Sequence, residues 1–318
     1  MSLLERIFAE PEFAAAPPVL VDVGAAGGVH RPWREIARFC IGVGFEPDAR
    51  EVAPLSAAQS QFKRWVYCPT LVVPAPTPGD RQDLHLTRSP QCSSTLRPDG
   101  AALGEWAFAD SFAVEETRSF AATTLQRALA GQGIGRIDWL KCDTQGLDLG
   151  IFRSLPEAER ARLLVVEFEP GLIDAYAGED KLAEVLAAMD REPFWLADLG
   201  VCSTPRGRPE MFTRHLGAGA LPWVQRLAPG ASAWANVRLL RDFSQQPETL
   251  DRRAHLLGWV FATITGQHGG ALAVAEAGAK QFAGDLFPEL TAASVRRLRR
   301  AMARNFPAWL WRRFGPGR

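Results

Sequence analysis

The chain has 318 residues, which is long enough for one large α/β domain with extensions or for two domains of average size. Hydrophobic residues make up 47% and charged residues 23% of it, as in packed globular proteins and unlike disordered or fibrous ones. The 36 basic residues balance the 36 acidic ones, and a formal net charge of zero excludes the electrostatics of a general nucleic-acid binder.

The five cysteines are scattered and form no C-x-x-C pair, so neither a disulfide framework nor a cysteine zinc site is expected. A reducing compartment fits this usage better. Charged residues near the N-terminus interrupt any secretory hydrophobic segment. The most apolar stretch, Leu256 to Thr265, is about half the ~20 residues that a membrane span needs. We therefore expect a cytoplasmic protein without a transmembrane segment.

Apolar runs alternate with segments of helical spacing along most of the chain. Its first part is predicted to hold a short helix before Pro17, strands over 19–23, 40–45, 66–73 and 83–87, and helices over 32–39 and 52–62. A polar hairpin is predicted around Gly79, and residues 89–120 are predicted to be rich in loops. The following part is predicted to hold strands over 137–143, 163–168, 194–199 and 234–240, and helices over 123–130, 150–155 and 180–189.

Alternating strands and helices favour an α/β fold with a Rossmann-like, seven-stranded, mostly parallel sheet and helices on both faces. Beyond about Ser244 the pattern becomes helical and strandless. We therefore expect an N-terminal helical segment over 1–16, an α/β domain over 17–242 and an α-helical C-terminal extension over 243–318.

A glycine-rich turn, Gly24-Ala25-Ala26-Gly27-Gly28, connects the first strand to the following helical segment. Such a turn presents backbone N–H groups to a polar or anionic ligand. Glu46 follows the second strand, where an acidic side chain in such folds binds ribose hydroxyls. The pattern predicts a nucleoside-containing cofactor at the carboxyl edge of the sheet, and the simpler alternative is a tight turn with a solvated acid.

The dinucleotide fingerprint G-x-G-x-x-G fails here, because Ala26 and Val29 stand where it needs glycine. The acidic-led pattern Asp22-x-Gly24-x-Ala26-x-Gly28 instead matches, with one Gly→Ala change, the D-x-G-x-G-x-G turn of class I S-adenosylmethionine (SAM) methyltransferases.

Further segments match in order over about residues 19–200: 21–28, 44–48, Cys92-Ser93-Ser94 with Pro98, Thr124-Leu125, 137–148 and 165–169. Through them the chain resembles the FkbM-type methyltransferase family. Of that family's K-x-D-x-E-G-x-E signature the chain keeps Lys141, Asp143 and Gly146. It carries Gln145 and Asp148 where the family usually has Glu, and Gln126 where an acid commonly follows Thr-Leu.

The resemblance implies a SAM-dependent O-methyltransferase acting on a hydroxyl, most often of a sugar in a glycan or small glycoside. It implies that the glycine turn binds the methionine end of SAM, that Glu46 binds its ribose, and that the loop of Ser93 and Ser94 closes the pocket with Asp143. The cofactor-binding residues implied are Asp22, Gly24, Ala25, Ala26, Gly28, Glu46, Ser93, Ser94 and Asp143.

Asp143, at the end of a strand, is the first candidate for the general base, because strand-end carboxylates lie at the mouth of a parallel sheet. His30 is a second catalytic candidate, although a surface position at a helix start explains it equally well. Asp143, Glu167 and Glu169 could together bind Mg²⁺ through oxygen atoms. The simpler expectation for Glu167 and Glu169 is polar anchoring at a strand end.

Two other functions stay open. An NAD(P)-dependent oxidoreductase could use a related sheet, although Ala26 and Val29 disfavour it. A catalytically silent module could keep the fold to bind a glycan or a protein, and the altered residues Gln126, Gln145 and Asp148 are compatible with that.

The segment from Ser294 to Arg318 contains eight arginines and no acidic residue. Val295, Leu298, Met302 and Phe306 fall on one face of a helix there. A basic amphipathic helix with tryptophan can lie on an anionic membrane surface. We expect instead that this helix packs its apolar stripe on the protein and leaves the arginines in water.

Overall fold

The computed structural model describes residues 1–51, 61–245 and 250–314. Two compact units make up the chain: one is Pro17–Leu239, and the other combines Met1–Ala16 with Leu240–Arg318. The N-terminal segment and the C-terminal extension, which the sequence predicts as separate parts, thus belong to one unit. Most of the helix predicted over 52–62 lies outside the described residues.

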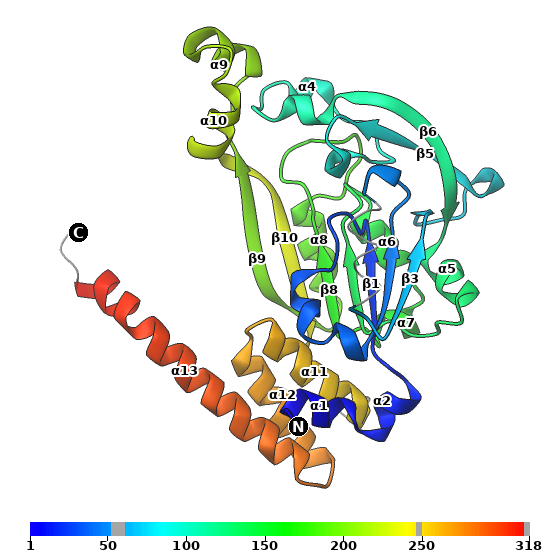
Figure 1. The fold of residues 1–318 in the computed structure, drawn as a ribbon, viewed down its shortest axis with the longest axis vertical. Helices are drawn as coiled ribbons and strands as arrows, with labels where there is room; N and C mark the ends of the chain where they lie inside the picture. The colour runs from blue at the N-terminus through cyan, green and yellow to red at the C-terminus, as the bar shows by residue number, and fades with distance from the viewer. Residues whose placement is uncertain (52–60, 246–249, 315–318) are drawn as a thin grey trace. The chain divides into compact units, whose positions relative to one another are not determined.

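The unit Pro17–Leu239 is built on a seven-stranded sheet. Its strands are β1 (Val19–Val23), β2 (Ile41–Phe45), β3 (Arg64–Cys68), β7 (Trp139–Cys142), β8 (Val165–Phe168), β9 (Phe194–Thr204) and β10 (Ala231–Arg241). They lie in the order β3-β2-β1-β7-β8-β10-β9 (Figure 1). The five strands from β3 to β8 pair in parallel, and Gly171, just after β8, pairs antiparallel with Trp234 of β10. The predicted α/β class with a mostly parallel seven-stranded sheet is confirmed.

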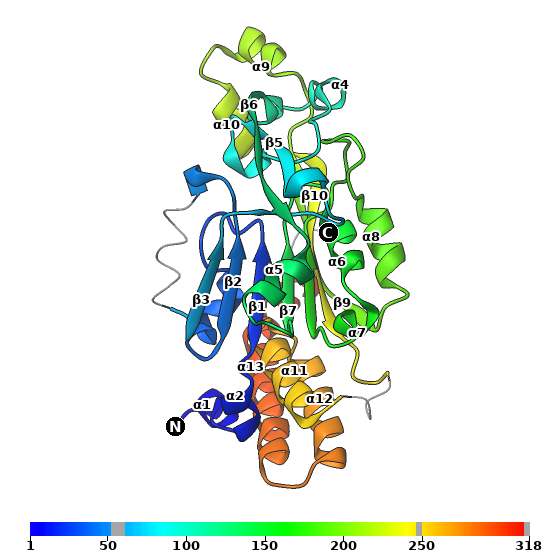
Figure 2. The ribbon, with the colours of Figure 1, turned by 90° about the vertical axis from the view of Figure 1, so that its right-hand side faces the viewer.

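One face of this sheet carries the main hydrophobic core. Alternate strand residues such as Val21, Leu140 and Val166 point to it, as the two-residue period of a strand requires. The helices α5 (Leu125–Gly131), α6 (Asp148–Ser154) and α8 (Leu182–Met189) cover this face, and the short α7 (Glu157–Arg160) follows α6 (Figure 2).

The opposite face is packed by short 3₁₀ helices. Residues predicted as one helix over 32–39 form η1 (Arg31–Glu35) and η2 (Ala37–Phe39), which are interrupted at Ile36, where φ is −118°. Trp33 of η1 packs edge-on against Trp139 of β7 with ring centroids 6.0 Å apart.

A second, three-stranded sheet lies beside the first one and has the order β4-β6-β5. Its strands are β4 (Leu71–Val72), β5 (Arg81–Thr87) and β6 (Val114–Thr123). The single strand predicted over 66–73 is therefore wrong, because β3 and β4 belong to different sheets. The hairpin predicted around Gly79 is also wrong, since β5 pairs antiparallel with β6. Most of β6 is exposed and lacks an apolar alternation, so the prediction of loops over 89–120 missed its start.

Several short helices surround these strands. They are η3 (Ala49–Glu51), η4 (Pro78–Asp80), η5 (Pro90–Cys92), α4 (Gly100–Leu103) and η6 (Ala109–Phe112). The helices α9 (Pro209–Leu216) and α10 (Leu221–Leu227) connect β9 to β10 (Figure 1). The strand predicted over 194–199 continues to Thr204.

The other unit is helical, as the sequence predicts for the C-terminal extension. It holds α1 (Leu3–Phe8), α2 (Pro11–Ala15), α11 (Arg252–Ile264), α12 (His268–Gln281) and α13 (Leu286–Phe314). Trp259, Phe261 and Leu290 are fully buried in it. Arg252 joins the N-terminal segment to α11 through ion pairs of 2.6 Å with Glu10 and with Glu12. Among the described residues, no helix combines the length and the hydropathy of a membrane span.

Candidate active site

A cavity of about 460 Å³ opens where β1, β2, β7 and β8 end, and the smaller sheet forms its far wall. Ligand pockets in open α/β sheets lie at this carboxyl edge. Five carboxyl groups line the cavity, those of Glu46, Asp48, Asp143, Glu169 and Glu179. Within the described part of the chain, none of the lining residues is Lys, Arg or His.

The glycine turn after β1 forms one edge of the cavity through Gly24 and Ala26. Gly24, Gly27 and Gly28 have φ of +81°, +79° and +93°, values that favour glycine. A Cβ atom at Gly24 would lie 1.9 Å from the carbonyl oxygen of Asp143, so this position also needs glycine for space. The N–H groups of Gly24 and Ala25 both donate to the Phe45 carbonyl at 3.0 Å. These contacts hold the ends of β1, β2 and β7 together.

Glu46 follows β2 and is 8% exposed. Its carboxylate accepts a hydrogen bond of 2.7 Å from the Asp48 N–H, and its carbonyl accepts one of 2.6 Å from the Tyr67 hydroxyl. Burial raises the pKa of the Glu46 carboxyl to about 7. The predicted ribose-binding residue therefore lies in the cavity, in a fixed orientation.

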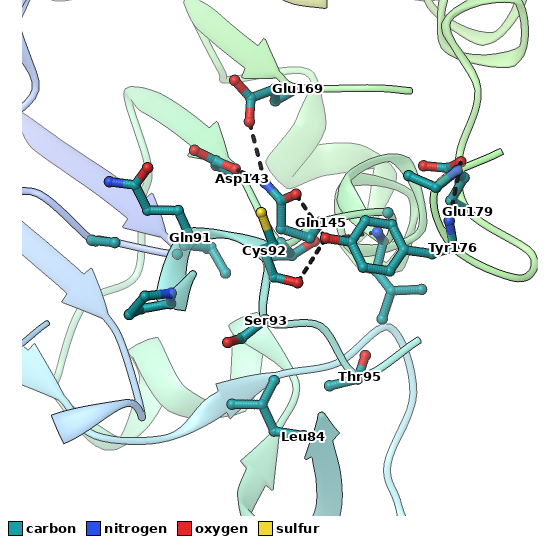
Figure 3. A pocket seen from close by; sticks show the side chains of 18 of the residues that line it. Leu84, Gln91, Cys92, Ser93, Thr95, Asp143, Gln145, Glu169, Tyr176 and Glu179 are labelled. Carbon is teal, nitrogen blue, oxygen red and sulfur yellow. Dashed lines mark hydrogen bonds between the residues drawn. The ribbon is translucent and has the colours of Figure 1, made fainter. Parts of the chain in front are cut away.

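Gln145 links the two carboxyl groups at the ends of β7 and β8. Its amide Nε2 donates to Asp143 Oδ1 at 2.9 Å and to Glu169 Oε2 at 3.2 Å (Figure 3). Burial and the neighbouring charge of Asp143 raise the pKa of Glu169 to about 8. Glu169 consequently holds its proton at neutral pH.

The backbone of Gln145 is in the left-handed region, with φ of +57°. Ser94, fully buried, donates from Oγ to the Gln145 carbonyl at 2.8 Å. The Tyr176 hydroxyl lies 3.1 Å from Gln145 Oε1 and 2.8 Å from the Cys92 carbonyl, so its one proton is shared between two acceptors (Figure 3). These contacts offset a strained backbone and fix the direction of the Gln145 amide.

Asp148 does not line the cavity, but it holds the segments that follow β7 and β8 in place. Its Oδ1 accepts from the Thr144 N–H at 2.8 Å, and its Oδ2 accepts from the Glu169 N–H at 2.8 Å. Burial and the charge of Asp143 raise its pKa to about 6. Asp148 thus ties the loop after β7 to the end of β8.

The predicted site residues fall into two groups. Those that line the cavity are Gly24, Ala26, Glu46, Ser93, Asp143 and Glu169, whereas Asp22, Ala25, Gly28, His30, Ser94 and Glu167 do not line it. Asp22 is buried on β1 and accepts a hydrogen bond of 2.9 Å from Lys141, its cross-strand neighbour on β7.

His30 lies against β8 and not in the cavity. Its Nε2 is 3.0 Å from Glu167 Oε1, which also accepts from Trp139 Nε1 at 2.9 Å, while Arg238 Nη2 donates to Glu167 Oε2 at 3.2 Å. Burial alone would raise the pKa of Glu167, but His30 and Arg238 outweigh it and lower this pKa to about 2. His30 and Glu167 are part of an ion-pair network on the sheet.

The metal set suggested by the sequence is not assembled. Within residues 1–51, 61–245 and 250–314, no three His, Cys, Asp or Glu side chains are grouped as metal ligands. Glu167 is bonded to His30 and Arg238, while Asp143 and Glu169 are bonded to Gln145.

Sequence reasoning missed the aromatic side of the cavity. Phe108 and Trp234 stack with ring centroids 6.0 Å apart and an interplanar angle of 12°, and Phe112 and Tyr176 pack beside them. Phe108 and Phe112 come from the start and the end of η6, Tyr176 from the segment after β8 and Trp234 from β10, and no motif connects them. Gln145 links Asp143 to Glu169, and the sequence signal for this role was its place between Lys141 and Asp148 in the family signature.

Compared with known proteins, the chain matches no family model, no curated protein and no solved structure. Its function is therefore argued from the chemistry of the site.

Proposed function

We propose that this protein is a SAM-dependent O-methyltransferase, with its active site in the cavity at the carboxyl ends of β1, β2, β7 and β8. The observation that carries the proposal is the charge of the cavity wall. Five carboxyl groups line the cavity, and none of the described lining residues is Lys, Arg or His. Arg50 and Lys141 pair with Asp48 and Asp143 from outside the lining.

An acidic wall suits a cationic ligand. The sulfonium of SAM carries a positive charge, whereas the pyrophosphate of NAD(P) carries negative charges that these carboxylates would repel. The strand order also differs from the order 3-2-1-4-5-6 of six-stranded dinucleotide-binding sheets. In this protein β10, the last strand in the chain, lies between β8 and β9 in the sheet. Both observations favour the methyltransferase over the oxidoreductase.

The residues around the cavity fit the parts of such a cofactor. Gly24 and Ala26 line the cavity at the turn after β1, where a ligand would lie against them, and Glu46 offers a carboxylate to ribose hydroxyls. When bound, SAM supplies an activated methyl group, so the protein mainly has to position an acceptor oxygen.

Asp143 is the proton acceptor in this proposal. Gln145 donates to Oδ1 of Asp143, and Lys141 Nζ lies 3.5 Å from Oδ2, which is the oxygen proposed to take the proton of an acceptor hydroxyl. Glu169 keeps its own proton at neutral pH and so does not compete. The stacked rings of Phe108 and Trp234 provide an apolar wall for the acceptor. Together with the family resemblance, this wall supports a sugar hydroxyl as the acceptor, in a glycan or a glycoside.

The test is thermal unfolding with S-adenosylhomocysteine (SAH), NAD⁺ or NADP⁺, for the native chain and for Glu46→Ala. At a ligand concentration of ~100 Kd, binding adds about 2.7 kcal/mol, which raises the Tm of a chain of this size by about 5–10 °C. The exposed residue Glu157 provides a matched control, Glu157→Ala.

We expect a shift with SAH alone, retained in Glu157→Ala and reduced in Glu46→Ala. A shift with NAD⁺ would make the oxidoreductase the better assignment. The absence of a shift with all three ligands would leave the silent binding module, and the methyltransferase proposal would be dropped.

A further inference from the structure

The C-terminal helix α13 is packed along its first part only. Leu290 and Ser294 are fully buried, and Trp259 of α11 donates from Nε1 to Ser294 Oγ at 2.9 Å. Val295 and Leu298 are half-buried. These contacts fix the direction of the helix up to about its middle.

From residue 302 onward the helix leaves this packing. Met302 and Trp311 are each 70% exposed, Phe306 is 54% exposed and Trp309 is 55% exposed. The expectation that the helix packs its apolar stripe on the protein therefore holds for Val295 and Leu298 and is wrong beyond them. Large apolar side chains scattered singly on a surface are ordinary, but here they follow one another along a single helix.

Helical geometry places most of the apolar side chains in this part of α13 on one face. At 100° per residue, Met302, Phe306, Trp309 and Leu310 fall on one face. The exposed arginines Arg300 and Arg304 fall on the opposite face, and Arg296 lies at its edge. Arg299 and Arg313 instead fall on the apolar face, from which their long side chains can reach water. Glu289 is the last acidic residue of the sequence, and eight arginines follow it.

We propose that residues 295–314 of α13 form a docking surface for an anionic lipid membrane, with the apolar face at the acyl boundary and the arginines among the headgroups. Amphipathic helices with basic polar faces and aromatic residues on the other face bind in this way. This inference does not depend on the proposed methyltransferase activity.

Charge decides between a membrane and other occupants of this face. A second copy of residues 295–314 would bring two sets of arginines together, and this segment contains no acid to neutralise them. A nucleic acid would neutralise the arginines but would offer no apolar phase for Met302, Phe306 and Leu310. An anionic bilayer supplies both environments.

The experiment is cosedimentation of the full chain with vesicles of phosphatidylcholine containing phosphatidylglycerol, compared with vesicles of phosphatidylcholine alone. One variant removes charge: Arg296→Gln, Arg300→Gln and Arg304→Gln combined. A matched control removes three exposed arginines elsewhere: Arg31→Gln, Arg162→Gln and Arg226→Gln combined. A third variant, Trp309→Ser with Leu310→Ser, removes apolar surface.

We expect binding to the anionic vesicles only, weakened by 0.5 M NaCl. Each arginine near such a surface contributes about fivefold to partitioning, so the charge variant should bind about a hundredfold more weakly than the matched control. The apolar variant should also bind more weakly than the native chain.

Three results would overturn the proposal. The first is the absence of binding to anionic vesicles, and the second is equal loss in the charge variant and its matched control. The third is unchanged vesicle binding by the apolar variant, because the arginines alone would then account for the binding. Sedimentation equilibrium of the native chain adds a check: a dimer abolished by Trp309→Ser with Leu310→Ser would assign the face to a second copy.

Discussion

The amide nitrogen of Gln145 donates a hydrogen bond to Oδ1 of Asp143 across 2.9 Å, from a backbone held at φ of +57°. The same nitrogen reaches Glu169, so one neutral donor connects two carboxyl groups in a buried place. A carboxylate in this position would have no proton to donate and would add a negative charge beside these two acids. The glutamine therefore lets the two acids lie close together, and it keeps Asp143 fixed at the edge of the cavity.

Gln145→Glu should destabilise the protein by about 1–3 kcal/mol at pH 8, because two half-buried acceptors lose their donor. Urea unfolding measures this difference. Gln126→Glu is the matched control, since exposed Gln126 lies 3.3 Å from Glu159 and water screens the added charge there. Equal losses in the two variants would contradict the role assigned to Gln145.

The titration of Glu169 makes stability depend on pH. Burial and the charge of Asp143 raise the folded-state pKa of Glu169 from its ordinary value of 4.5 to about 8. The folded protein therefore binds a proton that the unfolded chain has lost, and stability falls as pH rises from about 4.5 to 8.

Glu169→Gln removes this proton and keeps an oxygen that accepts from Gln145. The free energy of unfolding of the variant minus that of the native chain should be larger at pH 8.5 than at pH 5.5. Urea unfolding of both proteins at the two pH values measures this difference. Glu157→Gln, an exposed acid, should show no such change. A constant difference between Glu169→Gln and the native chain across this pH range would count against the raised pKa.

The parallel strands and the acidic residues at their ends could be predicted from the sequence alone. Glu46 and Asp143 were predictable at the cavity because the carboxyl ends of parallel strands meet at one edge. Asp22 was misplaced because strand register pairs it with Lys141, and a single strand does not reveal its cross-strand neighbour.

Other parts of the site had no sequence signal. The strand β6 is exposed along most of its length, so no two-residue period marks it. Tyr176 and Trp234 reach the cavity from loops and strands that only the folded chain brings together. The roles of Ser94 and Asp148 are also tertiary, since each holds backbone groups of another loop.

Gly24→Ala should disrupt the cavity edge, whereas Gly27→Ala should be tolerated. Both positions have φ near +80°, so both alanines carry a similar backbone strain of about 1 kcal/mol. At Gly24 the added Cβ would also meet the Asp143 carbonyl at 1.9 Å, while at Gly27 nothing lies within 4 Å. Thermal unfolding should show a much larger loss for Gly24→Ala, and equal losses would mean that the end of β7 moves aside at little cost.

His30→Gln should lower stability without changing the cavity. Nε2 of His30 lies 3.0 Å from Glu167, and hydrogen bonds to a carboxylate contribute about 1.5–3 kcal/mol in such places. His30 is absent from the cavity wall, so the increase in Tm that SAH produces should stay the same as in the native chain. Glu46→Ala should behave in the opposite way, with a reduced response to SAH. If His30→Gln kept its stability and lost the response to SAH, His30 would belong to the active site after all, and the ion-pair assignment would be wrong.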